Sequence, residues 1–461
     1  MTDGATSPVA SPDALPTPSP PRPSFSVALT AWLEIGLLSF GGPTAQIAVM
    51  HRVLVDRRGW LDDAAFLRGL NFCLLLPGPE AHQLVTWLGY KQFGWRGGLA
   101  AGLLFVLPGA VVMAAQSLAY AAWQATPVVV SSMFGLKAAV IALVVLALRR
   151  LALKILHHPA LVVLAIVAFA AMWWGLPFPL VMLIAAAAGL AVPVRAAAGP
   201  ETAAPPTPIA QPAAEQAATP RGGLSRFCGV LAAGLIIWWA PVAIAAAALG
   251  PDHLLVEEGC FFGKLAVLSF GGAYAVLSWL QQAAVAEMGW LTTAEMADGL
   301  GLAETTPGPL ILVTQFVGTL AAWNRPAPFS PLVAGLLGGA ITVWTTFAPS
   351  FLWIFLAGSA IDRIRPTSLV SRALNGVSAA VVGVIAVLAT QLALQTAFPG
   401  TGAARPFGVL SLTTDVDCDL RAVLLAAGAW FALRRFPNRM GWVLAGTVAA
   451  GAAVLSVTGR G

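Results

Sequence analysis

The sequence has few charged side chains. Only 10% of its 461 residues are Asp, Glu, Lys or Arg, whereas a soluble globular chain carries roughly 25%. The hydrophobic share is 58% and the mean hydropathy is +0.82. This composition excludes an ordinary soluble protein and predicts a polytopic membrane protein. The positive-inside bias of membrane proteins accounts for the net charge of +5, so no nucleic-acid partner is expected.

Cysteine is scarce, and the familiar enzyme motifs are missing. The four cysteines lie far apart without a CxxC pair, so neither a disulfide framework nor a metal site is expected. The chain also lacks HExxH, a nucleophile elbow and a glycine-rich phosphate loop. We therefore expect no enzyme activity, no catalytic residues, no metal and no cofactor.

Long apolar runs dominate the chain instead. A helix needs about 20 apolar residues to cross a bilayer. Suitable runs include residues 98–122, 128–148, 230–249, 332–356 and 373–397. None resembles a cleavable signal peptide, because the first apolar run begins only after Pro23. The predicted fold class is an all-α polytopic membrane protein.

The chain contains an internal repeat. SFGG at residues 39–42 recurs at 269–272, and PGP at 77–79 recurs at 307–309, both 230 residues later. Trp60 recurs as Trp290 at the same offset, so the span between the motifs was duplicated without insertion or deletion. Further on, Gly135 matches Gly376 at an offset of 241. A gene-sized duplication is the simplest cause.

Composition divides the chain around these copies. Residues 1–24 are rich in Pro, Ser and Thr and are predicted to be a disordered cytoplasmic tail. Residues 25–195 form the first predicted repeat and 257–458 the second. The Ala/Pro-rich segment 196–225 is predicted to be a cytoplasmic linker, followed by one linking transmembrane helix at 226–250. This single additional membrane crossing would invert the second repeat relative to the first, as in many secondary transporters.

Two arrangements of the SFGG and PGP segments remain open. Each segment crosses the membrane, or each is a re-entrant helical hairpin with its tip at GG or PGP. With hairpins, 18 Lys and Arg residues lie inside and 4 outside, whereas the crossing arrangement gives 15 and 7. The positive-inside rule favours hairpins. The predicted fold is therefore two inverted repeats, each with two re-entrant hairpins followed by four transmembrane helices.

The PGP motifs are candidate anion sites. Proline suits the first turn of a helix, and the free amides there carry partial positive charge. The first copy would present the amides of Glu80, Ala81 and His82, and the second those of residues 310–312. The alternative is that PGP only kinks two helices for packing. The glycines of the GG motifs equally suit either close helix packing or ligand contact.

Ionisable residues at membrane depth are few: Glu34, Arg68, Glu80, Lys137, Lys264 and Glu304. Each costs several kcal/mol unless it is partnered or hydrated. Lys137 and Lys264 are candidate countercharges for an anion. Glu34 and Lys264 occupy equivalent repeat positions and would be able to pair. Glu80 and Glu304 flank the PGP motifs and are predicted to carry a coupling proton, with helix N-terminal capping as the alternative.

At these residues the sequence resembles a known family. SFGGP (39–43) with LPGPEAHQL (76–84), repeated as SFGGA (269–273) with ETTPGPLILVTQFVG (304–318), is similar to the long, two-domain form of the chromate ion transporters. The resemblance covers nearly all of the chain after the N-terminal tail. It departs from the family pattern at Ala273, which replaces a proline, and at His82, where a methionine is expected.

The resemblance implies a multi-pass protein of the bacterial inner membrane, with a cytoplasmic N-terminus, that exports chromate and confers chromate resistance. Sulfate or another oxyanion, a lipid-phosphate flippase or enzyme, and a homodimer remain open alternatives. The family signature corresponds here to Phe40, Gly41, Gly42, Pro43, Pro77, Gly78, Pro79, Glu80, Gln83, Phe270, Gly271, Gly272, Pro307, Gly308, Pro309 and Gln315. The predicted substrate-binding residues are Gly41, Gly42, Pro77, Gly78, Pro79, Glu80, His82, Gln83, Lys137, Lys264, Gly271, Gly272, Thr306, Pro307, Gly308, Pro309 and Gln315.

Overall fold

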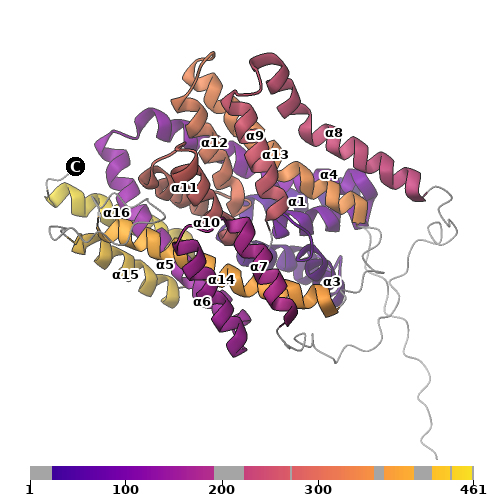
Figure 1. The fold of residues 1–461 in the computed structure, drawn as a ribbon, viewed down its shortest axis with the longest axis horizontal. Helices are drawn as coiled ribbons and strands as arrows, with labels where there is room; N and C mark the ends of the chain where they lie inside the picture. The colour runs from indigo at the N-terminus through magenta and orange to yellow at the C-terminus, as the bar shows by residue number, and fades with distance from the viewer. Residues whose placement is uncertain are drawn as a thin grey trace, which may run out of the picture.

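The computed structural model describes residues 23–191, 223–269, 273–357, 368–398, 418–436 and 439–458, and every element in these ranges is a helix (Figure 1). The first half comprises α1 (Phe25–Leu38), α2 (Gly42–His51), η1 (Arg52–Arg57), α3 (Asp63–Cys73), α4 (Glu80–Trp123), α5 (Pro127–Ile155), α6 (Pro159–Trp173) and α7 (Phe178–Ala191). Helix α8 (Gly223–Leu249) follows. The second half comprises α9 (Leu254–Leu268), α10 (Ala273–Gln281), η2 (Gln282–Glu287), α11 (Thr293–Thr305), η3 (Leu310–Leu312), α12 (Val313–Asn324), α13 (Pro331–Ala357), α14 (Ser368–Ala397), α15 (Leu420–Arg435) and α16 (Met440–Thr458).

Six helices in the described ranges are long and apolar enough to cross a membrane. They are Glu80–Trp123, Pro127–Ile155, Phe227–Leu249, Pro331–Ala357, Ser371–Ala397 and Met440–Val457. All five apolar runs predicted from the sequence lie inside them. The expectation of an all-helical, multi-pass membrane protein is confirmed.

The predicted boundaries between the repeats are only partly visible. The proposed tail and most of the proposed linker, residues 1–22 and 196–222, lie outside the described residues. Helix α8 begins at Gly223, so the last three residues of the predicted linker are helical. The rest of α8 corresponds to the predicted linking helix, and its Trp238 indole donates a hydrogen bond to the Thr345 carbonyl of α13.

The local structure of the first half recurs in the second. The π-helix η1 and its counterpart η2 lie 230 residues apart, and each is followed by a glycine with positive φ, Gly59 (58°) and Gly289 (57°). Asp62 caps α3 by accepting a hydrogen bond from the amide of Ala65, and Thr292 caps α11 in the same way. The duplicated sequence therefore folds into equivalent elements.

The chain reverses direction at each PGP motif. Gly69 of α3 lies against the Trp87 ring of α4, and Gly299 of α11 lies against the Phe316 ring of α12. In one continuous helix, residues 69 and 87 would be about 27 Å apart. The contacts therefore mean that α3 and the start of α4 run antiparallel, as do α11 and α12.

A second reversal follows soon after. Helix α4 bends at Phe93 and Gly94, where φ and ψ leave the helical region. As a result Gly89 lies against the backbone of Gly97, and Gly318 of α12 lies against Gly338 of α13 in the same manner. Residues 80–92 and 95–123 are thus two helices in space, equivalent to α12 and α13.

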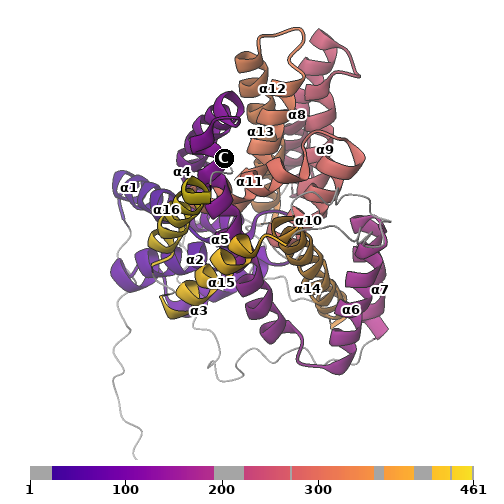
Figure 2. The same cartoon turned by 90° about the vertical axis from the view of Figure 1, so that its left-hand side faces the viewer.

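The two halves interlock through their long helices. Helix α5 packs mainly against α15 and α16 of the second half, and α14 packs mainly against α6 and α7 of the first (Figure 2). Gly135 of α5 approaches the Thr447 carbonyl, and Gly376 of α14 approaches the Ala185 carbonyl. These two glycines are the pair that recurs at the offset of 241 in the sequence. Each half therefore completes its packing with helices of the other.

Candidate functional site

The two PGP motifs meet the two SFGG motifs across the halves. The Gly78 amide donates to the Ser269 carbonyl at 2.9 Å, and the Gly308 amide donates to the Ser39 carbonyl at 2.7 Å. Ser39 and Ser269 end their helices with nearly the same backbone, at φ −84° and −79°. The four breaks predicted from the sequence are thus joined in two reciprocal pairs.

The PGP backbone follows from its residue types. Pro77 and Pro79 have no N–H group, and Gly78 adopts φ +126°, which other residues rarely reach. Pro79 is the N-cap of α4, and the first helical hydrogen bond runs from the Gln83 amide to its carbonyl at 2.9 Å. The amides of residues 80–82 therefore have no acceptor within the helix.

The helix start at the second PGP motif differs from the prediction. We call the PGP motifs at residues 77–79 and 307–309 the first and second tips. The helix at the second tip begins as the 3₁₀ turn η3, in which the Leu312 amide donates to the Pro309 carbonyl at 2.9 Å. The sequence predicted three free amides at residues 310–312. Because a 3₁₀ turn closes its hydrogen bond one residue earlier than an α-helix, Leu312 is not among them.

Each tip packs on the long helix of the opposite half. A methyl group on Gly78 would lie 3.0 Å from the Ser350 hydroxyl of α13, and one on Gly109 of α4 would collide with the Pro307 carbonyl. Positions 109 and 350 are equivalent at the offset of 241 residues. The tips therefore contact two membrane-spanning helices, at Gly109 near the centre of residues 95–123 and at Ser350, seven residues before the end of α13.

The first tip is surrounded by buried polar side chains. His82 is fully buried, with its ring edge-on to Phe347 and Phe351 at centroid distances of 5.2 and 4.8 Å. Gln83 donates from Nε2 to the Pro77 carbonyl at 2.6 Å. Within the described residues, several buried polar atoms near this tip have no hydrogen-bond partner: His82 Nδ1 and Nε2, Gln83 Oε1, Thr86 Oγ1, Thr346 Oγ1 and Ser350 Oγ.

The second tip is held by side-chain hydrogen bonds. Gln46 donates to the Gly308 carbonyl at 2.8 Å, and Gln315 donates to the Ala110 carbonyl at 3.0 Å. Thr306 donates to the Gln116 side-chain oxygen at 2.8 Å. The two tips thus have similar backbone hydrogen bonds, but the polar side chains around the second tip are hydrogen-bonded whereas several around the first are not.

Sequence reasoning identified His82 and Gln83 but missed Thr86, Thr346 and Ser350. The missed residues lie inside apolar runs and carry no motif of their own. A signal was nevertheless present, because Pro108 and Pro349 recur at the offset of 241 and the residue after each faces a tip.

The ionisable residues are dispersed. Glu80 is the half-buried first residue of α4, and Glu304 is buried near the end of α11. Lys137 forms an ion pair with Asp298 at 3.1 Å, and the Tyr120 hydroxyl donates to the same carboxylate at 2.9 Å. Lys264 is exposed on α9. Neither predicted countercharge is therefore seen beside a tip.

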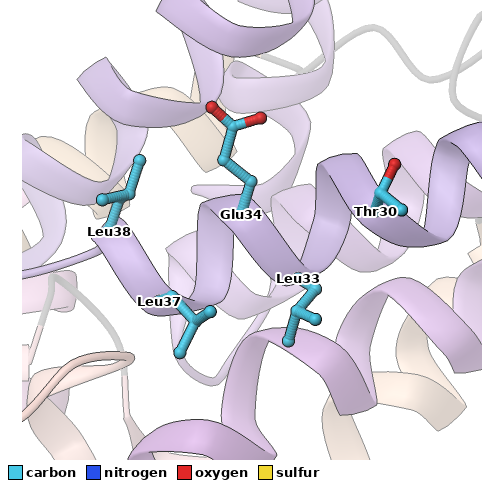
Figure 3. Close-up of a pocket in the computed structure, with 5 residues that line it drawn as sticks. All are labelled: Thr30, Leu33, Glu34, Leu37 and Leu38. Carbon is cyan, nitrogen blue, oxygen red and sulfur yellow. The ribbon is translucent and has the colours of Figure 1, made fainter.

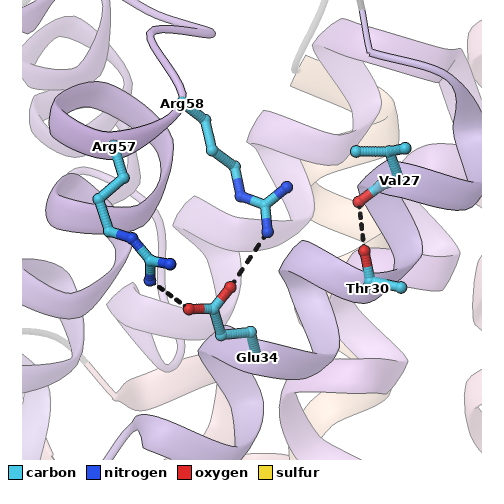
Figure 4. A network of polar contacts seen from close by, with 5 residues as sticks. All are labelled: Val27, Thr30, Glu34, Arg57 and Arg58. Carbon is cyan, nitrogen blue, oxygen red and sulfur yellow. Dashed lines mark hydrogen bonds and ion pairs between the residues drawn. The ribbon is translucent and has the colours of Figure 1, made fainter.

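Glu34 pairs within its own half rather than with Lys264. Its carboxylate contacts Arg57 and, at 3.1 Å, Arg58, as Figure 4 shows. At the positions 230 residues later the signs are reversed, with Lys264 and Glu287, both exposed. Glu34 and Lys264 are thus equivalent in sequence, but the observed partners of Glu34 are the last residue of η1 and the residue that follows it.

Only the first of the two GG motifs lies within the described residues. Gly41 and Gly42 have φ of 84° and 82°, and Gly41 lies close to the Met440 side chain of α16. Gly271 and Gly272 lie outside the described residues. Among the described residues no group of His, Cys, Asp and Glu side chains is arranged to hold a metal ion.

An open groove lies along α1, and its lining ends at Leu38, one residue before Ser39, whose carbonyl accepts a hydrogen bond from Gly308 of the second tip. The groove is lined by Thr30, Leu33, Glu34, Leu37 and Leu38, with an almost wholly apolar lining (Figure 3). It contains no residue of either PGP motif. The groove resembles a lipid-facing helix surface more than a site for a small polar solute.

Comparison with known proteins gives consistent matches. The model of the family described as Chromate transporter matches residues 27–190 and 257–454. The chromate transport protein of Pseudomonas aeruginosa is 32% identical over 399 residues, covering 84% of this chain and 85% of the relative. That of Cupriavidus metallidurans is 29% identical over 77% of this chain and 79% of its own length. A probable chromate transport protein of Synechococcus elongatus is 28% identical over 79% and 84%. No solved structure matches the chain.

Proposed function

Because the chain belongs to the chromate transporter family, and is thus a membrane transport protein rather than an enzyme, we propose that it exports chromate from the bacterial cytoplasm across the inner membrane and so confers chromate resistance. The relatives named above are chromate transport proteins by name. The direction of transport and the binding site are the parts that this proposal adds.

The reciprocal hydrogen bonds between PGP and SFGG carry the proposal. They hold the two helix N-termini at the junction of the halves, with the amides of residues 80–82 free of helical acceptors. Such amides bind a dianion without the cost of a fully buried cation. The unpartnered hydroxyls of Ser350 and Thr86 are the side chains able to complete the site, and Gln83 holds the Pro77 carbonyl of the PGP motif through its Nε2.

We assign the other predicted site residues supporting roles. Pro77, Pro79, Pro307 and Pro309 fix the tips. For Gly41, Gly42, Gly271 and Gly272 we keep the two predicted roles, close helix packing and ligand contact. Gln315 and Thr306 anchor the second tip. Lys137 meets the anion only when Asp298 releases it, and Lys264 guides anions from the surface. Glu80 and Glu304, which flank the tips, carry the coupling proton.

The same proposal includes inverted repeats with re-entrant hairpins. The antiparallel contacts Gly69–Trp87 and Gly299–Phe316 support hairpins whose turns are the PGP motifs. The interlocking of α5 with α15 and α16, and of α14 with α6 and α7, supports two halves related by a twofold axis. Movement of one hairpin pair against the other would then expose the tips alternately to each side, with the N-terminus in the cytoplasm.

Transport by purified protein in liposomes tests the function. We expect uptake of labelled chromate under an imposed pH gradient or membrane potential, applied separately, and weaker uptake of sulfate. Equal or preferential sulfate uptake would make the protein a general oxyanion transporter. The absence of uptake of either anion, together with unchanged chromate retention in expressing cells, would reject the proposal.

A lipid-phosphate substrate would need a lateral apolar opening at the tips. The apolar groove on α1 contains no residue of either PGP motif, so it supplies no PGP amide for a phosphate head group. Competition of chromate uptake by phosphatidic acid vesicles would distinguish the two substrates.

A further inference from the structure

Glu258 is a buried carboxyl group that the transport site does not use. It lies in the second turn of α9, and its exposed fraction is 0%. Its neighbour Glu257 is exposed on the same helix. In the described residues neither carboxyl oxygen of Glu258 has a hydrogen-bond partner.

The carboxyl group points into the junction of three helices. Helix α9 packs against α13, α8 and α12. A methyl group on Gly338 of α13 would lie 3.0 Å from Glu258 Oε2, at the place where Gly338 meets Gly318 of α12. Glu258 therefore borders the closest backbone contact between α12 and α13.

Among the described residues no cation pairs with this group: Lys264 of α9 is exposed, and Arg325, directly after α12, donates to the Gly289 carbonyl. Helices α12 and α13 contain no Asp, Glu, Lys, Arg or His. The one charged residue of α8, Arg226, lies 16 residues before Val242, which packs beside Gly259, so it is about 24 Å away along the helix. On α9 itself, His253 Nε2 contacts the Ala327 carbonyl and Glu257 carries a like charge.

An ionised carboxylate without partners in such a place costs several kcal/mol. A protonated carboxyl group avoids that cost. We propose that Glu258 is a proton-binding site whose protonation closes the contact of α9 with α12 and α13, and whose deprotonation opens it. The coupling of this proton to anion movement rests on the transport function proposed above.

The fold does not require a carboxyl group at this position. Helix α1 packs on the second part of α4 in the first half, where Phe25 meets the Phe93 ring and Gly36 lies against Leu104. The residue equivalent to Glu258 at the offset of 230 is Ala28, which is equally buried. The carboxyl group therefore distinguishes two otherwise equivalent helix junctions.

Its position also separates it from the anion site. Ser269, which binds Gly78, follows Glu258 by 11 residues, or about 16 Å of helix. The exposed residues Asp252 and Glu257 lie at the near end of α9, where protons have access from water. The Glu258 proton would be additional to the one assigned to Glu80 and Glu304, and it would act on anion movement through α9 and α13 rather than by direct contact with the anion.

Infrared difference spectra of the full-length protein in liposomes, recorded across a pH titration, test proton binding without any substrate. One component of the carbonyl stretch of protonated carboxyl groups should be present in the wild type and in Glu257→Gln and missing in Glu258→Gln. A band that persists unchanged in Glu258→Gln overturns the proposal. This result does not depend on whether the protein transports chromate.

Transport tests the coupling. Uptake of chromate driven by a pH gradient should be lower in Glu258→Gln than in the wild type, whereas Glu257→Gln should behave as the wild type. Thermal unfolding of both variants checks that they are folded. Unchanged gradient dependence in a folded Glu258→Gln overturns the coupling. If wild-type protein moves no chromate, the transport function fails while the infrared result still decides proton binding.

Discussion

The amide of Gly78 binds the carbonyl of Ser269, 191 residues further along the chain, at 2.9 Å. In the equivalent bond, the amide of Gly308 in the second half donates to the carbonyl of Ser39 in the first half. In each half, the glycine amide of PGP and the serine carbonyl of SFGG are thereby hydrogen-bonded by the other half. Since unsatisfied backbone groups are costly at membrane depth, this exchange explains how such breaks persist.

Substituting the tip glycines should abolish transport. Gly78→Ala would place a methyl group 2.7 Å from Gln83 Nε2 at a φ of +126°, and Gly308→Ala one 3.2 Å from the Phe105 carbonyl at +89°. The positive φ alone costs about 1–2 kcal/mol for an alanine. Gly59→Ala is the matched control, because its φ is also positive and no atom lies within 4 Å. Equal transport by all three variants would show that tip geometry is unimportant.

Removing the Ser350 hydroxyl should weaken anion binding without strain. A hydrogen bond to a charged group contributes about 1.5–3 kcal/mol, so Ser350→Ala should raise the KM for chromate about tenfold or more. Ser117→Ala serves as control, since Ser117 is also buried but donates to the Met113 carbonyl of its own helix. Similar KM values for the two variants would exclude Ser350 from the site.

The Lys137–Asp298 pair should couple the halves energetically. Lys137 belongs to the first half and Asp298 to the second, and their side chains are 25% and 7% exposed. Lys137→Met or Asp298→Asn alone should cost about 1–3 kcal/mol, and the double variant less than the sum. Thermal unfolding of the purified variants measures this. The exposed Lys264→Met should have little effect, and additive losses would argue against the pair.

The interlocking glycines should tolerate no larger side chain. Gly135→Ala and Gly376→Ala would drive a methyl group into the carbonyls of Thr447 and Ala185. Overpacking of this kind costs about 1–3 kcal/mol and should lower the unfolding temperature. Gly428→Ala on α15 meets no atom within 4 Å, so it should instead stabilise its helix by up to about 1 kcal/mol. A stabilised Gly135→Ala would contradict the observed packing.

Equivalent positions should face opposite sides of the membrane. Asp56→Cys and Ala286→Cys lie 230 residues apart, and both positions are exposed. In a chain whose four native cysteines are replaced by alanine, we expect a membrane-impermeant maleimide to label Cys at 286 in intact cells and Cys at 56 only after permeabilisation. Labelling of both from the same side would exclude inverted repeats.

Much of this architecture follows from patterns in the sequence. The five apolar runs became membrane-length helices because hydrophobic length alone decides whether a helix can span a bilayer. The offset of 230 residues also relates short elements: the two π-helices, and the two positive-φ glycines that follow them, lie at equivalent positions. The ion-pair partners of single side chains could not be predicted from the sequence. Lys137 pairs with Asp298, and Glu34 pairs with Arg57 and Arg58.

The sequence by itself determined where the backbone must break, because proline removes hydrogen-bond donors and glycine alone accepts the strained angles that follow. It also determined that the breaks occur twice in the same order. Only the tertiary structure decided that each PGP meets the SFGG of the other half, and that Ser350 and Glu258 face helix junctions. Those contacts join residues far apart in the chain, and a local pattern holds no information on which distant surface will satisfy a buried polar group.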